Sequence, residues 1–446
     1  MVVMSPRRRS RSSMAPAAFL LLLGLSAGAF AAAAAPKAPA APAAPAAPAA
    51  PAAPRPDARP GSSAPSPPSA PSASSAPSVG TAAPVAQPPR RPQEPVPPFP
   101  YPQREVAYDN GPVHLAGTLT VPEGRGPFPA VLLISGSGAH NRDEEIFGHK
   151  PFLVLADHLT RAEVAVLRVD DRGVGGSTGD GGGTTTEDRA GDALAGVRFL
   201  ASQPEIAKDR IGLLGHSEGG LVAALAASRS REVAFLVLLA TSGVPGHDLL
   251  LDQVEATARA GGAPEATVKQ LAALERQALE VIRAEKDEAA LRAKLAPIVR
   301  AAAELAPPAG RAAGASLDAA VERQVKASTS PWFRFFLTFD PRPVLRQVHV
   351  PVLAVGGDKD VQVPPARNLA AIERALQLGG NQDVTIRLIP NLNHLFQHSK
   401  TGSPAEYGAI EETFDPDLLG IVTRWIVARF GGRPAAPAPA AASPPQ

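Results

Sequence analysis

One pentapeptide carries the clearest chemical signal in the chain. Residues 215–219 read Gly-His-Ser-Glu-Gly, the pattern G-x-S-x-G, and lie between the apolar segments 210–214 and 221–225. This order predicts a strand, a sharp turn and a helix, and so tight a turn leaves no room for a side chain at either glycine. Ser217 would project from the rim of a sheet, and the backbone N–H of Glu218 would point to where an oxyanion forms. The pattern therefore predicts nucleophilic catalysis by a serine hydroxyl.

In a chain rich in Gly, Ala and Ser the pentapeptide alone is a weak signal, so its chemical partners matter. A serine of ordinary pKa needs a base, and the base needs an orienting carboxylate. Behind such an elbow the order along the chain is nucleophile, acid, histidine. Asp360 follows the predicted strand 351–355, and His394 follows the last predicted strand, 384–389. We predict Ser217 as nucleophile, Asp360 as acid and His394 as base.

Other assignments stay open at this point. Asp358 lies in the same loop as Asp360, and Asp248 follows the preceding strand, where an acid can also stand. His398 is a second candidate for the base. His216, inside the pentapeptide, is interpreted as packed beside the nucleophile rather than as catalytic.

The elements that must position these residues alternate along the chain. Two alternating segments around an Asp-Asn-Gly turn predict a hairpin at 104–122. Apolar runs then alternate with segments of helical periodicity, giving strands at 130–135, 164–169, 210–214, 233–239, 350–355 and 384–389 and helices at 152–160, 187–202, 366–378 and 416–430. This alternation predicts an α/β fold with a mostly parallel sheet and helices on both faces.

A long helical segment interrupts the sheet pattern. Residues 248–327 have helical periodicity broken at Pro264, Pro297 and Pro307, and the sheet resumes only near residue 350. We expect a helical cap insertion over 248–340. Its aromatic residues are expected to pack between cap and body rather than to contact substrate; they are Trp332, Phe333, Phe335 and Phe336.

Composition divides the chain into four parts. Residues 1–35 join an arginine cluster, a short apolar run and a string of alanines, which predicts an export signal and a periplasmic or secreted protein. Residues 36–98 are rich in Pro and Ala, which predicts a disordered linker that could tether the domain to the cell envelope. The hydrolytic domain is expected over 99–432, and a disordered tail over 433–446.

Charge and cysteine content exclude several classes of protein. The whole chain has a net charge of +2, but nine of its 44 basic and only two of its 42 acidic residues precede residue 99. The remaining 35 basic and 40 acidic residues give 99–446 a net charge of −5. This part of the chain therefore lacks the excess of basic residues that is typical of nucleic-acid-binding proteins. With no cysteine, the chain has no disulfide, thiolate metal site or cysteine nucleophile.

From about residue 104 to 430 the chain resembles bacterial α/β-hydrolases of the esterase and serine aminopeptidase-like group. The resemblance is carried by Ser135-Gly136-Ser137-Gly138, Arg142-Asp143-Glu144, Asp171-Arg172-Gly173-Val174-Gly175, Gly215-His216-Ser217-Glu218-Gly219, Gly357-Asp358-Lys359-Asp360 and Asn393-His394-Leu395-Phe396. It implies Ser217, Asp360 and His394 as the catalytic triad and the N–H groups of Ser137 and Glu218 as the oxyanion hole. Ser135 is a departure, because many relatives carry histidine there, which puts the support of the oxyanion loop in question.

The function expected from these residues is hydrolysis of a small-molecule carboxylic ester through an acyl-enzyme, without metal or organic cofactor. An aminopeptidase or amidase is the alternative within the same fold, with Glu218 or Glu144 holding a substrate ammonium group. A binding protein of the cell envelope that has lost the reaction is the alternative outside enzymes. Asp171 and Arg172 are expected to brace their loop rather than to bind substrate.

Overall fold

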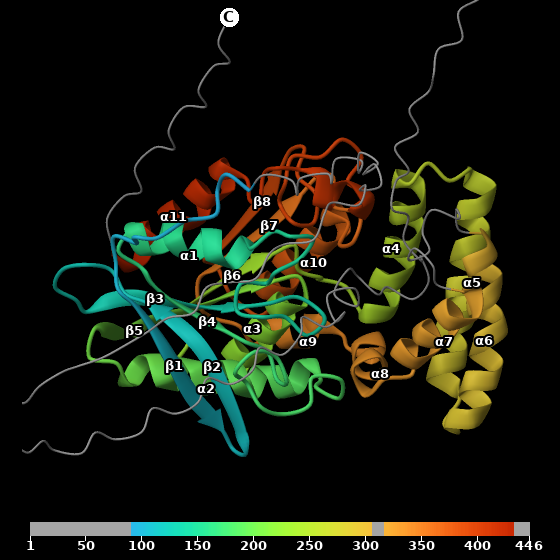
Figure 1. Cartoon of the computed structure of the whole chain (residues 1–446), viewed down its shortest axis with the longest axis horizontal. Coiled ribbons are helices and arrows are strands. Elements are labelled where there is room, and N and C mark those ends of the chain that lie inside the picture. The colour runs from blue at the N-terminus through green and yellow to red at the C-terminus, as the bar shows by residue number, and fades with distance from the viewer. Residues whose placement is uncertain (1–90, 306–315, 432–446) are drawn as a thin grey trace, which may run out of the picture. The chain divides into compact units, whose positions relative to one another are not determined.

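The central element is an eight-stranded sheet with helices on both faces (Figure 1). The structure is a computed structural model that describes residues 91–305 and 316–431. Its strand order is β1-β2-β4-β3-β5-β6-β7-β8. β1 and β2 join the sheet antiparallel, and every pair from β4 to β8 is parallel. The predicted mostly parallel α/β fold is confirmed.

The strands and the helices that cover them follow the predicted alternation. The strands are β1 (Gln103–Asn110), β2 (Val113–Thr120), β3 (Phe128–Ile134), β4 (Ala165–Val169), β5 (Ile206–His216), β6 (Phe235–Leu239), β7 (Val352–Gly357) and β8 (Val384–Ile389). The covering helices are α1 (Pro151–Arg161), α2 (Thr186–Ser202), α3 (Glu218–Arg229), α9 (Pro341–Leu345), α10 (Pro365–Leu378) and α11 (Pro416–Phe430). A short 3-10 helix, η3 (Pro404–Ala409), precedes α11.

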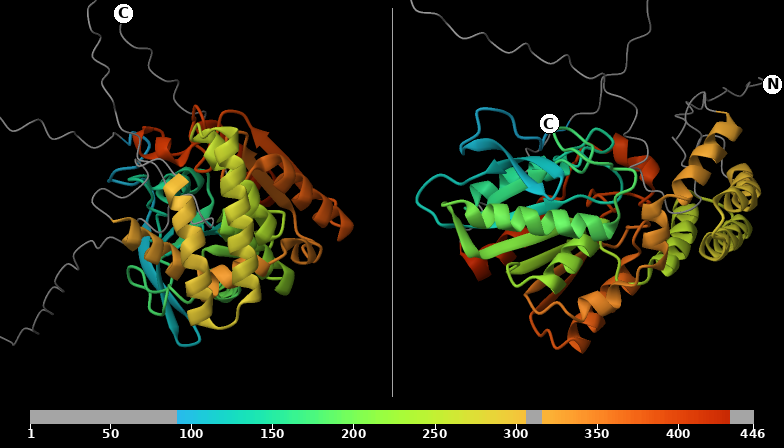
Figure 2. Two further views of the ribbon diagram at one scale, coloured as in Figure 1. Left: turned by 90° about the vertical axis from the view of Figure 1, so that its right-hand side faces the viewer. Right: turned by 90° about the horizontal axis from the view of Figure 1, so that it is seen from below.

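Two apolar layers enclose the sheet. α2, α3, α9 and α10 pack on one face and α1 and α11 on the other (Figure 2). All residues of β3, β6 and β7 are buried, which is why these strands read as unbroken apolar runs. Because the strands from β3 to β8 are parallel, the loops that follow β3, β5, β7 and β8 leave from the same edge of the sheet.

Of the six helices that the described residues form between β6 and β7, the first five make up a helical insertion. They are α4 (Gly246–Ala260), α5 (Glu265–Ala284), α6 (Glu288–Leu305), α7 (Leu317–Ser328) and α8 (Pro331–Thr338). Their apolar side chains form a cluster of their own that also includes Leu221 of α3 and Val363 after β7. The insertion therefore packs on the body next to α3, the helix that follows Ser217. Phe333 and Phe336 are buried in this cluster, as expected for them.

Pro297 does not break a helix, contrary to the expectation from sequence. α6 continues through it. Proline removes one backbone N–H and so leaves the carbonyl four residues earlier without its helical partner. Ala293 and Pro297 are both exposed, so water can bind that carbonyl and the helix persists. Pro264 does separate two helices, because it is the N-cap of α5.

Several sequence predictions fall on residues that the structure does not describe. These are the export signal at 1–35, residues 36–90 of the predicted linker and the tail at 433–446. The prediction that the linker is disordered as far as residue 98 is wrong for 91–98, because Arg91 and Gln93 donate hydrogen bonds to carbonyls of residues 408–414. Within 91–305 and 316–431, no helix has the length and apolar content required to span a bilayer.

Candidate active site

The chain turns sharply at Ser217, between β5 and α3. Ser217 has φ 55° and ψ −120°, a conformation that non-glycine residues seldom adopt. A Cβ on Gly215 would lie 2.1 Å from the carbonyl oxygen of Gly219, and one on Gly219 would lie 2.1 Å from that of Ile134 in β3. Glycine is therefore required on both sides, as the pentapeptide predicts. The Ser217 N–H donates to the Leu239 carbonyl at 2.8 Å, which ties the turn to β6.

Asp360 and His394 meet at the same edge of the sheet, from the loops after β7 and β8. His394 Nδ1 lies 2.8 Å from Asp360 Oδ2, and both residues are buried. The other oxygen, Asp360 Oδ1, accepts the N–H groups of Gln362 and Val363, each at 2.9 Å. The carboxylate is thus fixed in place, and the His394 ring directs its Nε2 away from Asp360.

The alternative residues are engaged elsewhere. Asp358 is exposed and accepts the backbone N–H of Asn391 at 2.6 Å. Asp248 lies at the start of α4 and forms an ion pair with Arg367. His398 is exposed and contacts Glu412. Neither aspartate has a hydrogen bond to His394 among the described contacts.

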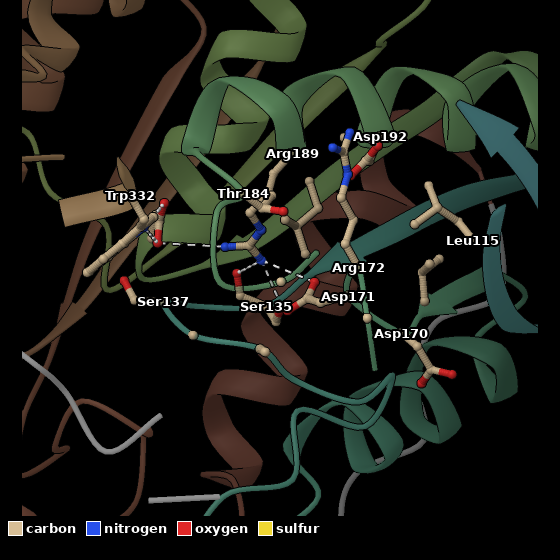
Figure 3. Close-up of a pocket in the computed structure, with 18 of the residues that line it drawn as sticks. Leu115, Ser135, Ser137, Asp170, Asp171, Arg172, Thr184, Arg189, Asp192 and Trp332 are labelled. Carbon is tan, nitrogen blue, oxygen red and sulfur yellow. Dashed lines mark hydrogen bonds and ion pairs between the residues drawn. The ribbon is translucent and has the colours of Figure 1, made fainter. Parts of the chain in front are cut away.

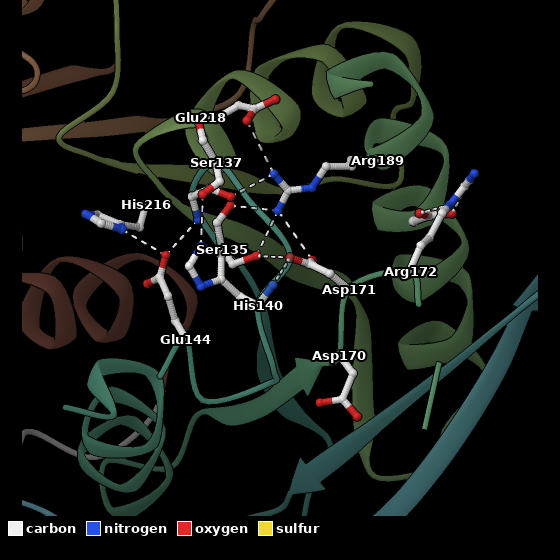
Figure 4. Close-up of polar contacts among 12 residues, drawn as sticks. Ser135, Ser137, His140, Glu144, Asp170, Asp171, Arg172, Arg189, His216 and Glu218 are labelled. Carbon is white, nitrogen blue, oxygen red and sulfur yellow. Dashed lines mark hydrogen bonds and ion pairs between the residues drawn. The ribbon is translucent and has the colours of Figure 1, made fainter. Parts of the chain in front are cut away.

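The loop after β3 is held by a buried arginine that sequence reasoning missed (Figure 4). Arg189, in α2, donates to the carbonyl oxygens of Gly136 at 2.9 Å and Ser135 at 2.8 Å. In a trans peptide the carbonyl and the next N–H point in opposite directions, so the N–H of Ser137 points away from Arg189. This is the N–H group that the sequence analysis predicts as an oxyanion donor.

The serine that replaces the usual histidine takes part in the same network. The Ser135 hydroxyl donates to Asp171 Oδ2 at 2.8 Å and accepts from Arg189 at 2.8 Å. Burial disfavours the arginine charge, but the carboxylates of Asp171, Glu218 and Glu144 raise the pKa of Arg189. Support for the loop after β3 therefore comes from a buried charge network. Asp171 does brace its loop, as predicted, whereas Arg172 pairs with Asp192 in α2.

Glu218 links the turn to the helical insertion. Its carboxylate is buried and accepts from Thr186 Oγ1 at 2.6 Å and from Trp332 Nε1 at 2.9 Å. Arg189 lies 3.7 Å from its other oxygen. Glu144, the second acid considered for a substrate ammonium group, lies 2.9 Å from His216 Nδ1 and accepts the N–H of Gly136. Both carboxylates are thus occupied by protein donors.

A cavity of about 460 Å³ extends from Ser137 and Trp332 to Leu115 in β2 (Figure 3). Much of the cavity wall is apolar. The charged side chains that line it form ion pairs with one another or with a near neighbour. These ion pairs are Arg172–Asp192, Arg189–Asp171, Arg189–Glu218 and Arg142–Asp170. Trp332 packs against Phe333 and Phe336, as expected for it, and its ring also lines this cavity. The volume and composition suit an uncharged group.

One group of side chains among the described residues has spacing suited to a metal ion. Ligand atoms of His398, Glu412 and Asp415 lie within 4.8 Å of one another. Both carboxylates already accept backbone N–H groups, Glu412 from His398 at 2.7 Å and Asp415 from Leu418 at 3.0 Å. These bonds account for the cluster without a ligand.

Comparison with known proteins assigns the class that the fold and site suggest. The profile of the Alpha/beta hydrolase family matches residues 131–408, more than half of the chain, and the chain belongs to that family. Esterase EstD of Thermotoga maritima is similar to it, with 26% identity over 316 residues, covering 70% of this chain and 65% of EstD. The chain thus spans a little less than two thirds of the length of that curated relative.

Solved structures with similar folds include three hydrolases from different organisms. The α/β-hydrolase GrgF of Penicillium sp. sh18 has a TM-score of 0.44 and 17% identity, covering 74% of this chain and 99% of GrgF. An esterase of Pyrococcus furiosus has a TM-score of 0.43 and 17% identity, covering 75% and 92%. Proline iminopeptidase of Mycobacterium smegmatis has a TM-score of 0.44 and 15% identity, covering 73% and 98%.

Proposed function

We propose that this protein is a serine hydrolase that cleaves carboxylic esters through an acyl-enzyme. Ser217 is the nucleophile, His394 the general base and Asp360 the acid that orients it. The observation that supports this most strongly is the buried 2.8 Å contact between His394 Nδ1 and Asp360 Oδ2, at the sheet edge from which Ser217 projects. Similarity to an esterase of Thermotoga maritima is consistent with it.

The mechanism follows from these positions. Asp360 holds the proton on Nδ1, so Nε2 of His394 carries the lone pair that takes the Ser217 proton as Oγ attacks the acyl carbon. The N–H groups of Ser137 and Glu218 stabilise the oxyanion. The tetrahedral intermediate collapses as His394 returns that proton to the leaving alcohol. Water gives a proton to His394 as it attacks the acyl-enzyme, and His394 passes that proton to Ser217 Oγ as the acid leaves.

The carboxylates near the nucleophile favour an ester over an aminoacyl substrate. An aminopeptidase must leave a carboxylate free to bind the substrate ammonium group. Glu218 is bonded to Thr186 and Trp332, and Glu144 to His216 and a backbone N–H. The paired charges along the cavity further favour an uncharged ester. An inactive envelope-binding protein is disfavoured because it has no need of a buried His394–Asp360 pair.

The test is hydrolysis of p-nitrophenyl butyrate by the full chain and by Ser217→Ala. Loss of the nucleophile should lower kcat by roughly a million-fold. A fluorophosphonate probe should label the wild type and not the variant. Equal turnover by both proteins would refute Ser217 as nucleophile, and faster hydrolysis of aminoacyl anilides than of esters would favour the aminopeptidase.

We also propose that the protein is exported, because residues 1–35 have the charge and apolar pattern of a signal peptide. Expression in a bacterial host and N-terminal sequencing of the periplasmic product should give a mature chain that begins near residue 35. A full-length chain recovered only from the cytoplasm would contradict export.

A further inference from the structure

His216 has acceptors at both ring nitrogens. Its Nε2 lies 3.0 Å from the backbone carbonyl of His394. A carbonyl carries no proton, so the hydrogen must be on Nε2. Its Nδ1 lies 2.9 Å from Oε1 of Glu144, and the same oxygen accepts the N–H of Gly136 at 2.7 Å. With Glu144 ionised, both nitrogens of His216 donate, and the ring carries a positive charge.

The surroundings of His216 favour that charged form. Burial opposes the charge, but Glu144 beside the ring, the bond to the His394 carbonyl and the more distant Asp360 together raise the pKa of His216. Burial likewise opposes ionisation of Glu144, but His216, His140 and the Gly136 N–H lower its pKa overall. Side-chain exposure of only 9% and 4% keeps water from replacing either partner.

These contacts connect three segments that the proposed reaction must hold together, namely the loop after β3, the end of β5 and the loop after β8. Gly136 precedes the Ser137 donor, His216 precedes the nucleophile, and His394 is the proposed base. Glu144 lies 72 residues from His216, and His394 lies 178 residues from it. One chain of hydrogen bonds, from the Gly136 N–H to the His394 carbonyl, therefore runs directly beside the reacting groups. The rings of His216 and His394 have centroids 4.9 Å apart.

We propose that the Glu144–His216 ion pair is a positioning pair, in which a doubly protonated His216 holds the backbone of His394 in register with the oxyanion loop. This inference rests on the proposed function.

Two substitutions separate the two bonds of His216. The amide nitrogen of Asn reaches the place of Nδ1, so His216→Asn keeps a donor to Glu144 and loses the bond to His394. The amide nitrogen of Gln reaches the place of Nε2, so His216→Gln keeps the bond to His394 and loses the pairing of Glu144. His349→Asn, at an exposed histidine, is the matched control.

Kinetics with p-nitrophenyl butyrate should distinguish these variants. His216→Asn should lower kcat roughly ten- to a hundredfold with little change in KM, as a misplacement of about 1 Å does. His216→Gln should retain more of kcat. A folded His216→Asn whose kcat equals that of the wild type, or that of His216→Gln, would overturn the inference.

The charge itself can be observed without turnover. In the full chain labelled with ¹⁵N-histidine, His216→Asn identifies the His216 signals by their disappearance. At neutral pH His216 should show a proton on both ring nitrogens. A single ring proton on His216 would overturn the inference even in an active esterase. A wild type with two ring protons but no esterase activity would instead refute the proposed function, and with it the positioning role.

Discussion

At the scale of single residues, two aspartates only two positions apart have different surroundings. Asp360 is buried and accepts two backbone N–H groups as well as contacting His394. Asp358 is exposed and closes a turn by accepting the N–H of Asn391. The difference arises because the loop after β7 turns one side chain toward the sheet edge and the other toward solvent.

We predict that Asp360→Asn lowers kcat on p-nitrophenyl butyrate by about 10⁴-fold, because an amide no longer selects the His394 tautomer with its lone pair on Nε2. Asp358→Asn is the matched control and should change kcat by less than about twofold. Steady-state kinetics on both variants is the measurement. Greater loss in Asp358→Asn than in Asp360→Asn would reverse the assignment.

His216 should also make stability depend on pH. Because the pKa of His216 is raised above 6.5 in the folded protein, its stabilisation is complete below 6.5 and is lost as pH rises through the folded pKa. The free energy of unfolding of the wild type should therefore exceed that of His216→Asn, and the difference should shrink as pH rises above 6.5. Urea denaturation across this range measures the margin. A margin that widens with pH would contradict a charged His216.

At the scale of elements, α8 and the turn at Ser217 are joined through one indole. Trp332 donates from Nε1 to the buried carboxylate of Glu218, whose backbone N–H is a proposed oxyanion donor. The helical insertion thus contacts the proposed site directly. This contact gives the insertion a route to influence the donor geometry.

Trp332→Phe keeps an aromatic ring but removes the N–H, so the buried Glu218 carboxylate loses one of its hydrogen-bond donors. We predict a loss of about 1–3 kcal/mol in the free energy of unfolding, the usual cost of such a group. Urea denaturation gives the value. Phe335→Leu, on the same helix, is a suitable comparison because Phe335 stacks on Phe339 and does not line the cavity. An equal or larger loss in Phe335→Leu would contradict a specific role for the indole.

The segment 91–98 is bound to the part of the chain that follows the loop of His394. Arg91 donates to the carbonyls of Ile410 at 2.8 Å and Gly408 at 3.0 Å, and Gln93 donates to that of Phe414 at 2.6 Å. The Phe414 ring lies 5.7 Å from Phe396, in the loop of His394. These contacts hold 91–98, called the strap below, against residues 408–414, next to the loop of His394.

A chain that starts at residue 99 should therefore be less stable than one that starts at residue 91. We expect its free energy of unfolding to be lower by at least about 1.5–3 kcal/mol, the contribution of one hydrogen bond to a charged group. Its kcat should also be lower. Thermal and urea unfolding of both chains provide the test. Identical stability and turnover would show that the strap is dispensable.

At the scale of the whole molecule, the cavity is formed jointly by the sheet, α2, the loop before it and α8. Leu115 in β2 is buried at the end opposite Trp332. Leu115→Phe should shorten the cavity, so the preferred acyl or alcohol chain of p-nitrophenyl and alkyl ester series should become shorter. Leu388→Phe, at an exposed site on β8, is the size-matched control. An unchanged chain-length profile in folded Leu115→Phe would place the substrate elsewhere.

The sequence by itself determined the alternation of strands and helices, the turn at Ser217 and the succession of Ser217, Asp360 and His394. Each depends on local information: apolar period, glycines where no Cβ fits, and loops that must leave one edge of a parallel sheet. Helix α6 shows the limit of such rules, because exposure decides whether a proline such as Pro297 is tolerated.

Only the tertiary structure decided which groups support those residues. Arg189 lies 53 residues from Gly136, Glu144 lies 72 from His216, and Trp332 lies 114 from Glu218. No periodicity relates such partners, since their distances are set by how the layers pack. Arg189 reads in sequence as an ordinary helical arginine, and Trp332 as one more apolar residue of the insertion. Their roles arise from burial, because a buried polar group needs a hydrogen-bond partner and the tertiary structure decides which residue supplies it.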